Sequence, residues 1–196
     1  MTPSYGSGNE TRPRRMKAKV CLIGEQSCGK TELVRPFVSE TFDRRYLRTL
    51  GAIVSKKGLK LPNPRDGEVF VDLLILDILG EKRFLRMFGE AYMDGSSGIL
   101  AVCDASSKTT FEDLDEWMES VHRVTGRIPT VLAINRRVSS APERVTDSDA
   151  KQFAMRYEAP YFYTSSETGE NVDAAFNALG TRVVEDRLGP IRGSSD

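Results

Sequence analysis

The chain has 196 residues, 39% of them hydrophobic, and its 28 basic and 28 acidic residues leave no net charge. This length is enough for one globular domain with a sizeable core, and the balanced charge gives no electrostatic reason to expect nucleic acid or a membrane surface as a partner. The three cysteines are odd in number and match no metal-site spacing, which argues against a disulfide framework and a cysteine metal site.

The two ends of the chain are predicted to lie outside the folded domain. Residues 1–16 are rich in serine, threonine, glycine, proline and arginine, so we expect a disordered N-terminal tail, a domain over residues 17–187 and a flexible C-terminal tail over residues 188–196. No signal peptide or membrane-spanning stretch is evident, and Thr2 replaces the glycine that myristoylation needs. We therefore expect a cytoplasmic protein with no encoded lipid anchor.

A glycine-rich phosphate-binding motif follows the first predicted strand. Residues 18–23 are predicted to form a buried strand and residues 31–35 the first turns of a helix, and the segment between them fits G-x-x-x-x-G-K-[ST]. In such a loop the backbone N–H groups point inward, the helix N-terminus adds partial positive charge, and the lysine adds a full charge. The sequence therefore predicts a nucleoside polyphosphate site formed by Gly24, Glu25, Gln26, Ser27, Cys28, Gly29, Lys30, Thr31 and the adjoining Glu32.

Beyond the phosphate loop, strands and helices alternate. After a polar connection over residues 39–50, the pattern predicts a hairpin with arms at residues 52–60 and 69–76. Further strands are predicted at residues 98–103, 130–134 and 161–163, and helices at residues 110–124, 148–157 and 172–186. We therefore expect an α/β fold of the P-loop NTPase type, with a mostly parallel six-stranded sheet, one antiparallel strand and helices on both faces.

Two further segments would bring oxygen atoms to a cation beside the loop. Asp77 ends the predicted strand at residues 69–76, and a carboxylate in that position can hold magnesium through water. Gly80 can bring its backbone N–H to a γ-phosphate. Thr49 lies in the polar connection, where its hydroxyl would complete an octahedral shell. The predicted metal residues are Thr31, Thr49 and Asp77.

Together these motifs resemble those of the Ras-like small GTPases, and within them the Rab-type branch, from about residue 17 to residue 185. Beyond the phosphate loop, the segments that carry the resemblance are Thr49-Leu50-Gly51, residues 80–84, residues 91–100 and Gly169-Glu170-Asn171-Val172. The resemblance implies a switch that binds GTP or GDP with Mg²⁺, slowly hydrolyses GTP, and has two segments ordered by the γ-phosphate. It also implies an exchange factor, an activating protein and effectors as partners.

The same resemblance assigns roles to residues position by position. It implies that Lys30 neutralises the β- and γ-phosphate oxygens, that Thr31 and Thr49 bind magnesium, and that Asp77 holds the water shell of the ion. Gly80 would sense the γ-phosphate.

Further positions would surround the base and close the site. Phe42 matches the aromatic residue that packs on the edge of the base, and Tyr46 matches the tyrosine that closes over the phosphates. The Ser-Ala-Lys segment of the family is Ser165-Ser166-Glu167 here, and Ser166 still offers a backbone N–H to the exocyclic oxygen of guanine.

The guanine-recognition motif departs from the family pattern. Members carry Asn-Lys-x-Asp, whose aspartate accepts two hydrogen bonds from guanine, whereas this chain has Asn135-Arg136-Arg137-Val138. Asn135 is retained and the stem of Arg136 would pack where the lysine stem does. Val138 accepts no hydrogen bond, and because a charged hydrogen bond contributes roughly 1.5–3 kcal/mol, the guanine preference would fall by about one to two decades. Guanine stays the favoured base, with relaxed base specificity as the alternative and Asp147 or Asp149 as candidate substitute acceptors.

The catalytic glutamine of the family is also replaced. Glu81 follows Gly80, where the glutamine would orient the attacking water, and a solvated switch residue without a catalytic part is the alternative interpretation. Gln26 stands where many relatives carry a small residue and would crowd an arginine finger. We expect slow hydrolysis, on the order of less than one turnover per minute, with Lys30, Thr49, Gly80 and Glu81 as the catalytic set.

Two alternative classes remain. One is a non-catalytic nucleotide-binding scaffold of the same fold (a pseudo-GTPase), which Arg136, Val138 and Glu81 together suggest. The other is a phosphate-loop kinase or ATP-driven machine, although no segment of this chain offers the arginine-bearing lid that a small-molecule kinase usually needs.

Several other side chains receive structural interpretations. Cys21 and Cys103 lie in apolar strands and should be inert core residues, and Cys28 is interpreted as a small packing residue in the loop, with a redox role as the alternative. Trp117 is predicted to pack in or near the core, and His122 to be solvated.

Overall fold

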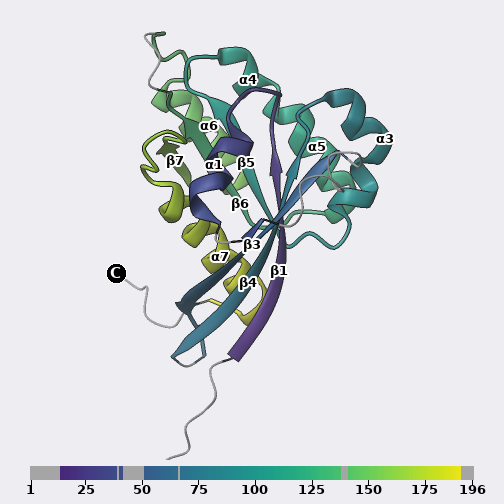
Figure 1. Ribbon diagram of the computed structural model, residues 1–196, viewed down its shortest axis with the longest axis vertical. Helices are drawn as coiled ribbons and strands as arrows, with labels where there is room; N and C mark the ends of the chain where they lie inside the picture. Colours follow the sequence, from purple (N-terminus) through teal and green to yellow (C-terminus); the bar gives the residue numbers. More distant parts are fainter. Residues whose placement is uncertain (1–13, 39, 42–50, 66, 138–140, 191–196) are drawn as a thin grey trace, which may run out of the picture.

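The centre of the fold is a single β-sheet, which lies among the residues that the computed structural model describes: 14–38, 40–41, 51–65, 67–137 and 141–190. Its strands are ordered β2-β3-β4-β1-β5-β6-β7 across the sheet (Figure 1). Their bounds are β1 Arg14–Ile23, β2 Glu40–Thr41, β3 Ala52–Pro62, β4 Glu68–Ile78, β5 Gly98–Asp104, β6 Thr130–Asn135 and β7 Tyr161–Thr164.

The strand directions confirm the predicted topology. β1 pairs in parallel with β4 and β5, and β5, β6 and β7 continue the parallel pairing. β3 runs antiparallel to β4 over its whole length. These six strands form the expected sheet, and the two-residue strand β2 adds a short antiparallel pairing at the β3 edge.

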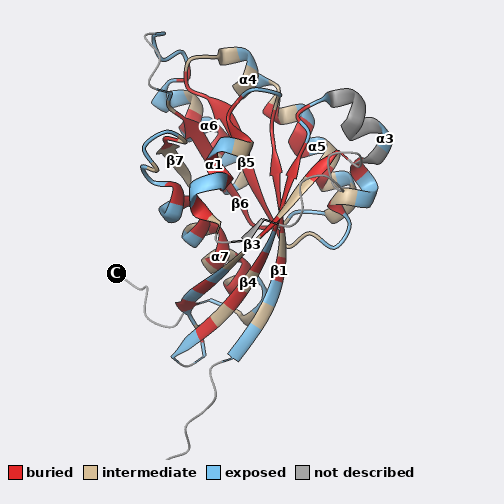
Figure 2. Ribbon diagram, in the orientation of Figure 1, coloured by how far each residue is buried: buried red, intermediate tan, exposed pale blue. Residues whose placement is uncertain are grey.

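Helices cover both faces of the sheet, as predicted. Their bounds are α1 Lys30–Phe37, α3 Lys82–Met93, α4 Lys108–Glu112, α5 Leu114–Thr125, α6 Asp147–Tyr157 and α7 Val172–Leu188. Because successive side chains of a strand point to opposite faces, Leu22 packs with α1 and α7, whereas Cys21 and Ile23 pack with α3, α5 and α6. Figure 2 shows that the central strands are the most deeply buried part of the fold.

Most predicted boundaries agree with the structure to within two residues, and the larger differences are these. β1 begins at Arg14, four residues before the strand predicted over residues 18–23, because Arg14 pairs with Val69 of β4. The helix predicted over residues 110–124 is divided into α4 and α5 at Asp113, whose backbone angles (φ −65°, ψ −17°) remain helical, so the break is local. Helix α3, over Lys82–Met93, had not been predicted as an element.

The side-chain interpretations mostly hold. Cys21, Cys28, Cys103 and Trp117 are fully buried, as expected of packing residues. His122 is half-buried rather than solvated, because its ring lies 5.9 Å from the ring of Tyr157. In the described part of the chain, no helix combines the length and the apolar character needed to cross a bilayer.

Candidate functional site

The phosphate-binding motif forms a loop between β1 and α1, at the carboxyl end of the parallel strands. Gly24 (φ 136°) and Gly29 (φ 94°) adopt backbone angles that favour glycine. A Cβ on Gly24 would lie 2.1 Å from the carbonyl oxygen of Val102, and one on Gly29 would lie 2.0 Å from Nδ2 of Asn135. Both glycines are therefore required by the close approach of neighbouring strands, which explains the motif in physical terms.

Lys30 is buried and its ammonium is turned onto the loop itself. Nζ donates hydrogen bonds to the carbonyl oxygens of Gly24 (2.7 Å) and Glu25 (2.8 Å). In a trans peptide the carbonyl and the following N–H point in opposite directions. The lysine therefore orients the peptide groups of the loop as well as supplying positive charge.

Asn135 ties the loop to the end of β6. Its Nδ2 donates to the carbonyl oxygen of Cys28 (3.1 Å), and its Oδ1 accepts from the backbone N–H of Ser166 (3.0 Å). The side chain is fully buried. Asn135 thus connects two segments that the sequence assigned to one nucleotide site.

Thr31 and Asp77 meet between the loop and β4. Thr31 Oγ1 donates to Asp77 Oδ2 over 2.5 Å. Burial raises the pKa of Asp77, although Thr31 and the charge of Lys30 oppose that rise. A desolvated carboxylate beside a hydroxyl is a fitting oxygen pair for a hard divalent cation such as Mg²⁺. These two of the three predicted metal residues therefore fit the expected ion.

The segment after β4 lies directly on the phosphate loop. The backbone N–H of Gln26 donates to the carbonyl oxygen of Gly80 (2.8 Å), and a Cβ on Gly80 would lie 2.3 Å from Gln26 N. Gly80 thus contacts the loop through its carbonyl, whereas the predicted γ-phosphate contact uses its N–H. Glu81 is exposed at the N-cap of α3, and its side chain makes no capping hydrogen bond.

A cavity of about 410 Å³ lies between these segments. Most of the described residues predicted to bind phosphate and metal line it, namely Gln26, Ser27, Gly29, Lys30, Thr31, Glu32, Asp77 and Gly80, whereas Gly24, Glu25 and Cys28 of the predicted loop do not. Gly51, Ala52 and Ile53 at the start of β3 close another side. The arrangement can hold a polyanion against a lysine, a helix N-terminus and a cation-binding oxygen pair.

The two arginines after Asn135 point to different partners. The guanidinium of Arg136 lies 4.1 Å from the centre of the Tyr163 ring and pairs with Glu143 over 2.8 Å. Arg137 instead donates a hydrogen bond to the carbonyl oxygen of Ser27 in the phosphate loop. The expectation that the stem of Arg136 packs where the family's lysine stem does stays a prediction, and the contact of Arg137 with the loop was not predicted.

The segment Ser165-Ser166-Glu167 follows β7 as a tight turn. Ser165 Oγ accepts hydrogen bonds from the backbone N–H groups of Glu167 (3.3 Å) and Thr168 (3.2 Å). Ser165 is buried, Ser166 is half-buried and Glu167 is exposed. The turn brings Ser166 N–H to Asn135, so this backbone donor is already oriented toward the end of β6.

Asp147 and Asp149 are engaged elsewhere. Asp149 accepts from the backbone N–H of Thr146 (2.8 Å) and pairs with Lys108 (2.5 Å), and these contacts lower its pKa to about 2. Asp147 accepts from the Tyr161 hydroxyl (2.7 Å). These bonds cap and brace α6, so the suggestion that either aspartate substitutes for the missing guanine acceptor finds no support.

One contact was not anticipated from the sequence. The indole Nε1 of Trp117, on α5, donates to Oε1 of Glu25 in the phosphate loop (3.0 Å). The two residues are 92 positions apart in the chain, and the sequence predicted only a core-packing role for the tryptophan.

Four predicted site residues, Phe42, Tyr46, Thr49 and Val138, lie outside the described residues.

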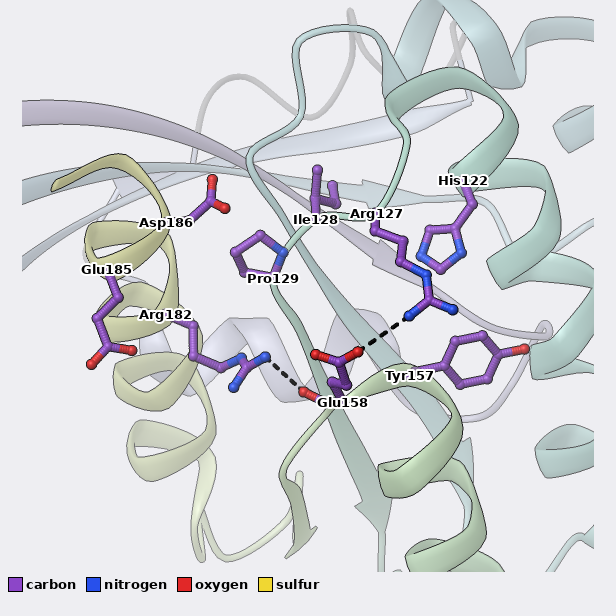
Figure 3. Close-up of a pocket in the computed structure, with 9 residues that line it drawn as sticks. All are labelled: His122, Arg127, Ile128, Pro129, Tyr157, Glu158, Arg182, Glu185 and Asp186. Atoms are coloured by element: carbon purple, nitrogen blue, oxygen red, sulfur yellow. Dashed lines mark hydrogen bonds and ion pairs between the residues drawn. The ribbon is translucent and has the colours of Figure 1, made fainter. Parts of the chain in front are cut away.

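A second cavity, of about 290 Å³, lies at the opposite end of β6, between the ends of α5 and α6 and helix α7 (Figure 3). Glu158 is its central acidic residue. Its carboxylate pairs with Arg127 over 3.3 Å, and its backbone oxygen accepts from Arg182 over 2.6 Å. Burial lowers the pKa of the neighbouring His122, and the charge of Arg127 lowers it further. None of the predicted site residues lines this cavity.

Comparison with known proteins indicates the same family as the phosphate-loop motif does. The model of the Ras family matches residues 19–185. The chain is 28% identical over 167 residues to "Ras-related protein Rab-13" of Mesocricetus auratus, which covers 85% of this chain and 79% of that protein. It is 27% identical over 168 residues to "Ras-related protein Rab-18" of Lymnaea stagnalis, covering 85% and 80%. It is 25% identical over 195 residues to "Ras-related protein SEC4" of Candida albicans, covering 97% and 90%.

Proposed function

This chain belongs to the Ras family, and its relatives place it on the Rab branch of small GTP-binding switch proteins, so we propose that it binds GTP and GDP together with Mg²⁺ and hydrolyses GTP slowly. The observation that carries the proposal is the cavity in which Lys30, Thr31 and Asp77 lie together beside the phosphate loop. Few other ligands would need a lysine, a helix N-terminus and a cation-binding oxygen pair at once.

Binding would use groups that are already in place. Lys30 would exchange its bonds to the carbonyl oxygens of Gly24 and Glu25 for bonds to phosphate oxygens. Thr31, Thr49 and Asp77 would hold magnesium, which neutralises phosphate charge and orients the phosphates when it is bound. A γ-phosphate would also compete with the Gly80 carbonyl for the N–H of Gln26. The segment after β4 would therefore move when the triphosphate binds, as a switch segment must.

Slow hydrolysis follows from the residues next to the γ-phosphate position. Glu81 is exposed and negatively charged, so it is poorly suited to orient water beside a phosphate. Gln26 is also exposed, where a bulky side chain would hinder an arginine supplied by an activating protein. Lys30, Thr49, Gly80 and Glu81 remain the catalytic set of this proposal.

Guanine is the proposed base, held by Asn135, neighbouring residues and the Ser166 N–H, which would exchange its bond to Asn135 Oδ1 for one to the base. Relaxed base specificity remains the alternative because Val138 lacks an acceptor. Identifying the nucleotide that co-purifies with the protein distinguishes the two. Guanine supports the proposal, whereas adenine or xanthine supports relaxed specificity.

The test of hydrolysis is single-turnover phosphate release from pre-bound GTP. We expect slow release from the wild type, and a strong reduction in Lys30→Ala and Thr31→Ala, because each substitution removes a phosphate or metal contact. Equal release from the wild type and both variants would dismiss the enzyme. Binding without release would instead favour the second candidate function, a nucleotide-binding scaffold without catalysis, to which Glu81 points.

We propose that the partners are those of a switch, namely an exchange factor, an activating protein and effectors that contact the nucleotide-dependent segments. The proposed location is the cytoplasm, because all three cysteines are free thiols and the cytoplasm keeps thiols reduced. Pull-down with protein loaded with GDP and, separately, with a non-hydrolysable GTP analogue would show nucleotide-dependent partners. Identical capture in both states would argue against a switch.

A further inference from the structure

Arg137 connects the phosphate loop with the ends of two strands. Its guanidinium donates to the carbonyl oxygen of Ser27, and its Nε lies 3.4 Å from Oδ2 of Asp104 at the end of β5. Asp104 is buried and fixed in place, because its Oδ1 accepts from the backbone N–H (2.8 Å) and hydroxyl (2.7 Å) of Ser106. The guanidinium of Arg137 therefore contacts the phosphate loop and the end of β5 at the same time.

The carbonyl that Arg137 contacts belongs to Ser27, whose backbone conformation is unfavourable for a residue with a side chain. Ser27 has a φ of 63°, in the left-handed region that non-glycine residues rarely adopt. Its neighbour Cys28 presents its carbonyl to Asn135. Two successive loop carbonyls are thus bound by side chains from one segment. Since a trans peptide points its N–H opposite to its carbonyl, these bonds direct the N–H groups of Cys28 and Gly29 away from that segment, and the Cys28 N–H donates to the carbonyl oxygen of Glu25 within the loop (3.4 Å).

The strand geometry explains why Arg137, and not Arg136, reaches the loop. The backbone N–H of Arg136 still bonds to the carbonyl of Thr164 in β7, so the chain continues in an extended conformation past Asn135. Successive side chains therefore alternate. Asn135 and Arg137 point to the phosphate loop, and Arg136 points to Tyr163 and Glu143.

We propose that Arg137 is a positioning residue of the nucleotide site, which holds Ser27 in its left-handed conformation and so keeps the backbone of the phosphate loop in place for the nucleotide. The inference rests on the proposed nucleotide-binding function. Arg137 makes no contact with the reacting atoms in this assignment. It acts through Ser27, and Asp104 acts through Arg137.

The test measures release of a fluorescent GDP analogue from the full chain in the presence of Mg²⁺. Because a hydrogen bond from a charged group contributes about one to two decades in an equilibrium constant, we expect Arg137→Ala to release the analogue at least about tenfold faster. Arg137→Lys keeps the charge and should restore part of the difference. Asp104→Asn should speed release in the same direction. Arg123→Ala, an exposed arginine of α5 outside the site, is the control and should release at the wild-type rate.

Arg123→Ala provides the comparison, because it removes the same type of side chain outside the site. The proposal requires release from Arg137→Ala to be clearly faster than release from Arg123→Ala. Thermal melting without nucleotide separates positioning from a general loss of stability, because a merely structural role would lower the Tm without a selective change in the release rate. If Arg137→Ala fails to fold, Arg137→Lys and Asp104→Asn carry the same comparison.

Two outcomes overturn the inference and are distinguishable from each other. Wild-type release from Arg137→Ala rejects the role of Arg137 alone and leaves the nucleotide-binding function intact. Failure of the wild type to retain any guanine nucleotide rejects the proposed function and the positioning role together.

Discussion

Thr31 and Asp77 share a hydrogen bond of 2.5 Å beside the phosphate loop, and so join the first turn of α1 to the end of β4. The two residues are 46 positions apart in sequence, and the parallel pairing of β1 with β4 brings them together. This pair links the phosphate loop to the strand whose end continues into Gly80 and α3. It also places a desolvated carboxylate where a cation would neutralise it.

The first prediction concerns Asp77 in the nucleotide-free protein with EDTA present. Burial raises the pKa of the folded carboxyl above its unfolded value near 3.8, so the folded state binds more protons between the two values and stability falls as pH rises through that window. Asp77→Asn keeps an acceptor for Thr31 but removes the charge. It should therefore be more stable than the wild type in urea at pH 7, by a margin that disappears toward pH 3.

With Mg²⁺ and nucleotide, the same substitution should have the opposite effect. Asp77→Asn should release a fluorescent GDP analogue faster than the wild type, because the amide does not supply the negative charge that holds the ion. Lower stability of the variant in EDTA at pH 7 would contradict the first part, and unchanged release would contradict the second.

The second prediction concerns the bond between Trp117 and Glu25 (3.0 Å). It holds a carboxylate of the phosphate loop on the indole N–H, and a carboxylate turned toward phosphate would repel it. Trp117→Phe should therefore weaken nucleotide binding by about tenfold, on the scale of one charged hydrogen bond. Adding Glu25→Gln should recover much of this loss, because it removes the charge. Titration calorimetry on both variants measures the effect, and a double variant no tighter than Trp117→Phe would count against it.

The third prediction separates helix capping from base recognition. Asp149 and Thr146 form a capping box at the start of α6, so Asp149→Ala should reduce stability at pH 7 by about 1 kcal/mol. The folded pKa of about 2 lies below the unfolded value of 3.8, so this contribution is present at neutral pH and is lost as pH falls from about 4 toward 2. The guanine preference should be unchanged, and a shift toward other bases in a competition assay would revive Asp149 as an acceptor.

The fourth prediction concerns thiol reactivity. Cys21, Cys28 and Cys103 are fully buried, and burial raises the pKa of each thiol. Less thiolate and no access mean slow alkylation. Mass spectrometry after iodoacetamide treatment should find no modified cysteine in the native protein and three in urea. Rapid native modification of Cys28 would restore the redox interpretation.

Local sequence patterns predicted most of the fold. Apolar runs bounded by polar turns marked β1, β5 and β6, because buried parallel strands are apolar on both faces. Helix α3 was not predicted, although the apolar residues of its sequence, among them Phe84, Phe88 and Tyr92, recur at helical spacing. The early start of β1 was also missed, because the basic residues Arg14 and Arg15 are held there by pairing with β4 and not by burial.

The phosphate loop was predictable because close backbone approach demands glycine at fixed positions. The residues expected near the base were less predictable from the sequence. Arg136 and Arg137 have identical side chains, and only the continuation of the β6 conformation past Asn135 decides which one faces the loop. The alternation of a strand would have indicated Arg137 if it had been extended beyond the predicted end of the strand. The contact between Trp117 and Glu25 depends on how α5 packs against the sheet, which no local pattern encodes.

The most direct test of the account is equilibrium binding of GTP and GDP, with Mg²⁺ present, to wild-type protein and to Lys30→Ala, measured by titration calorimetry after bound nucleotide has been removed. Lys30 supplies the one buried ammonium of the described site, so its removal should weaken binding by at least about tenfold, the scale of one charged hydrogen bond. We predict one nucleotide per wild-type chain and strongly reduced binding to the variant. No binding to folded wild-type protein, or equal binding to both proteins, would contradict the account.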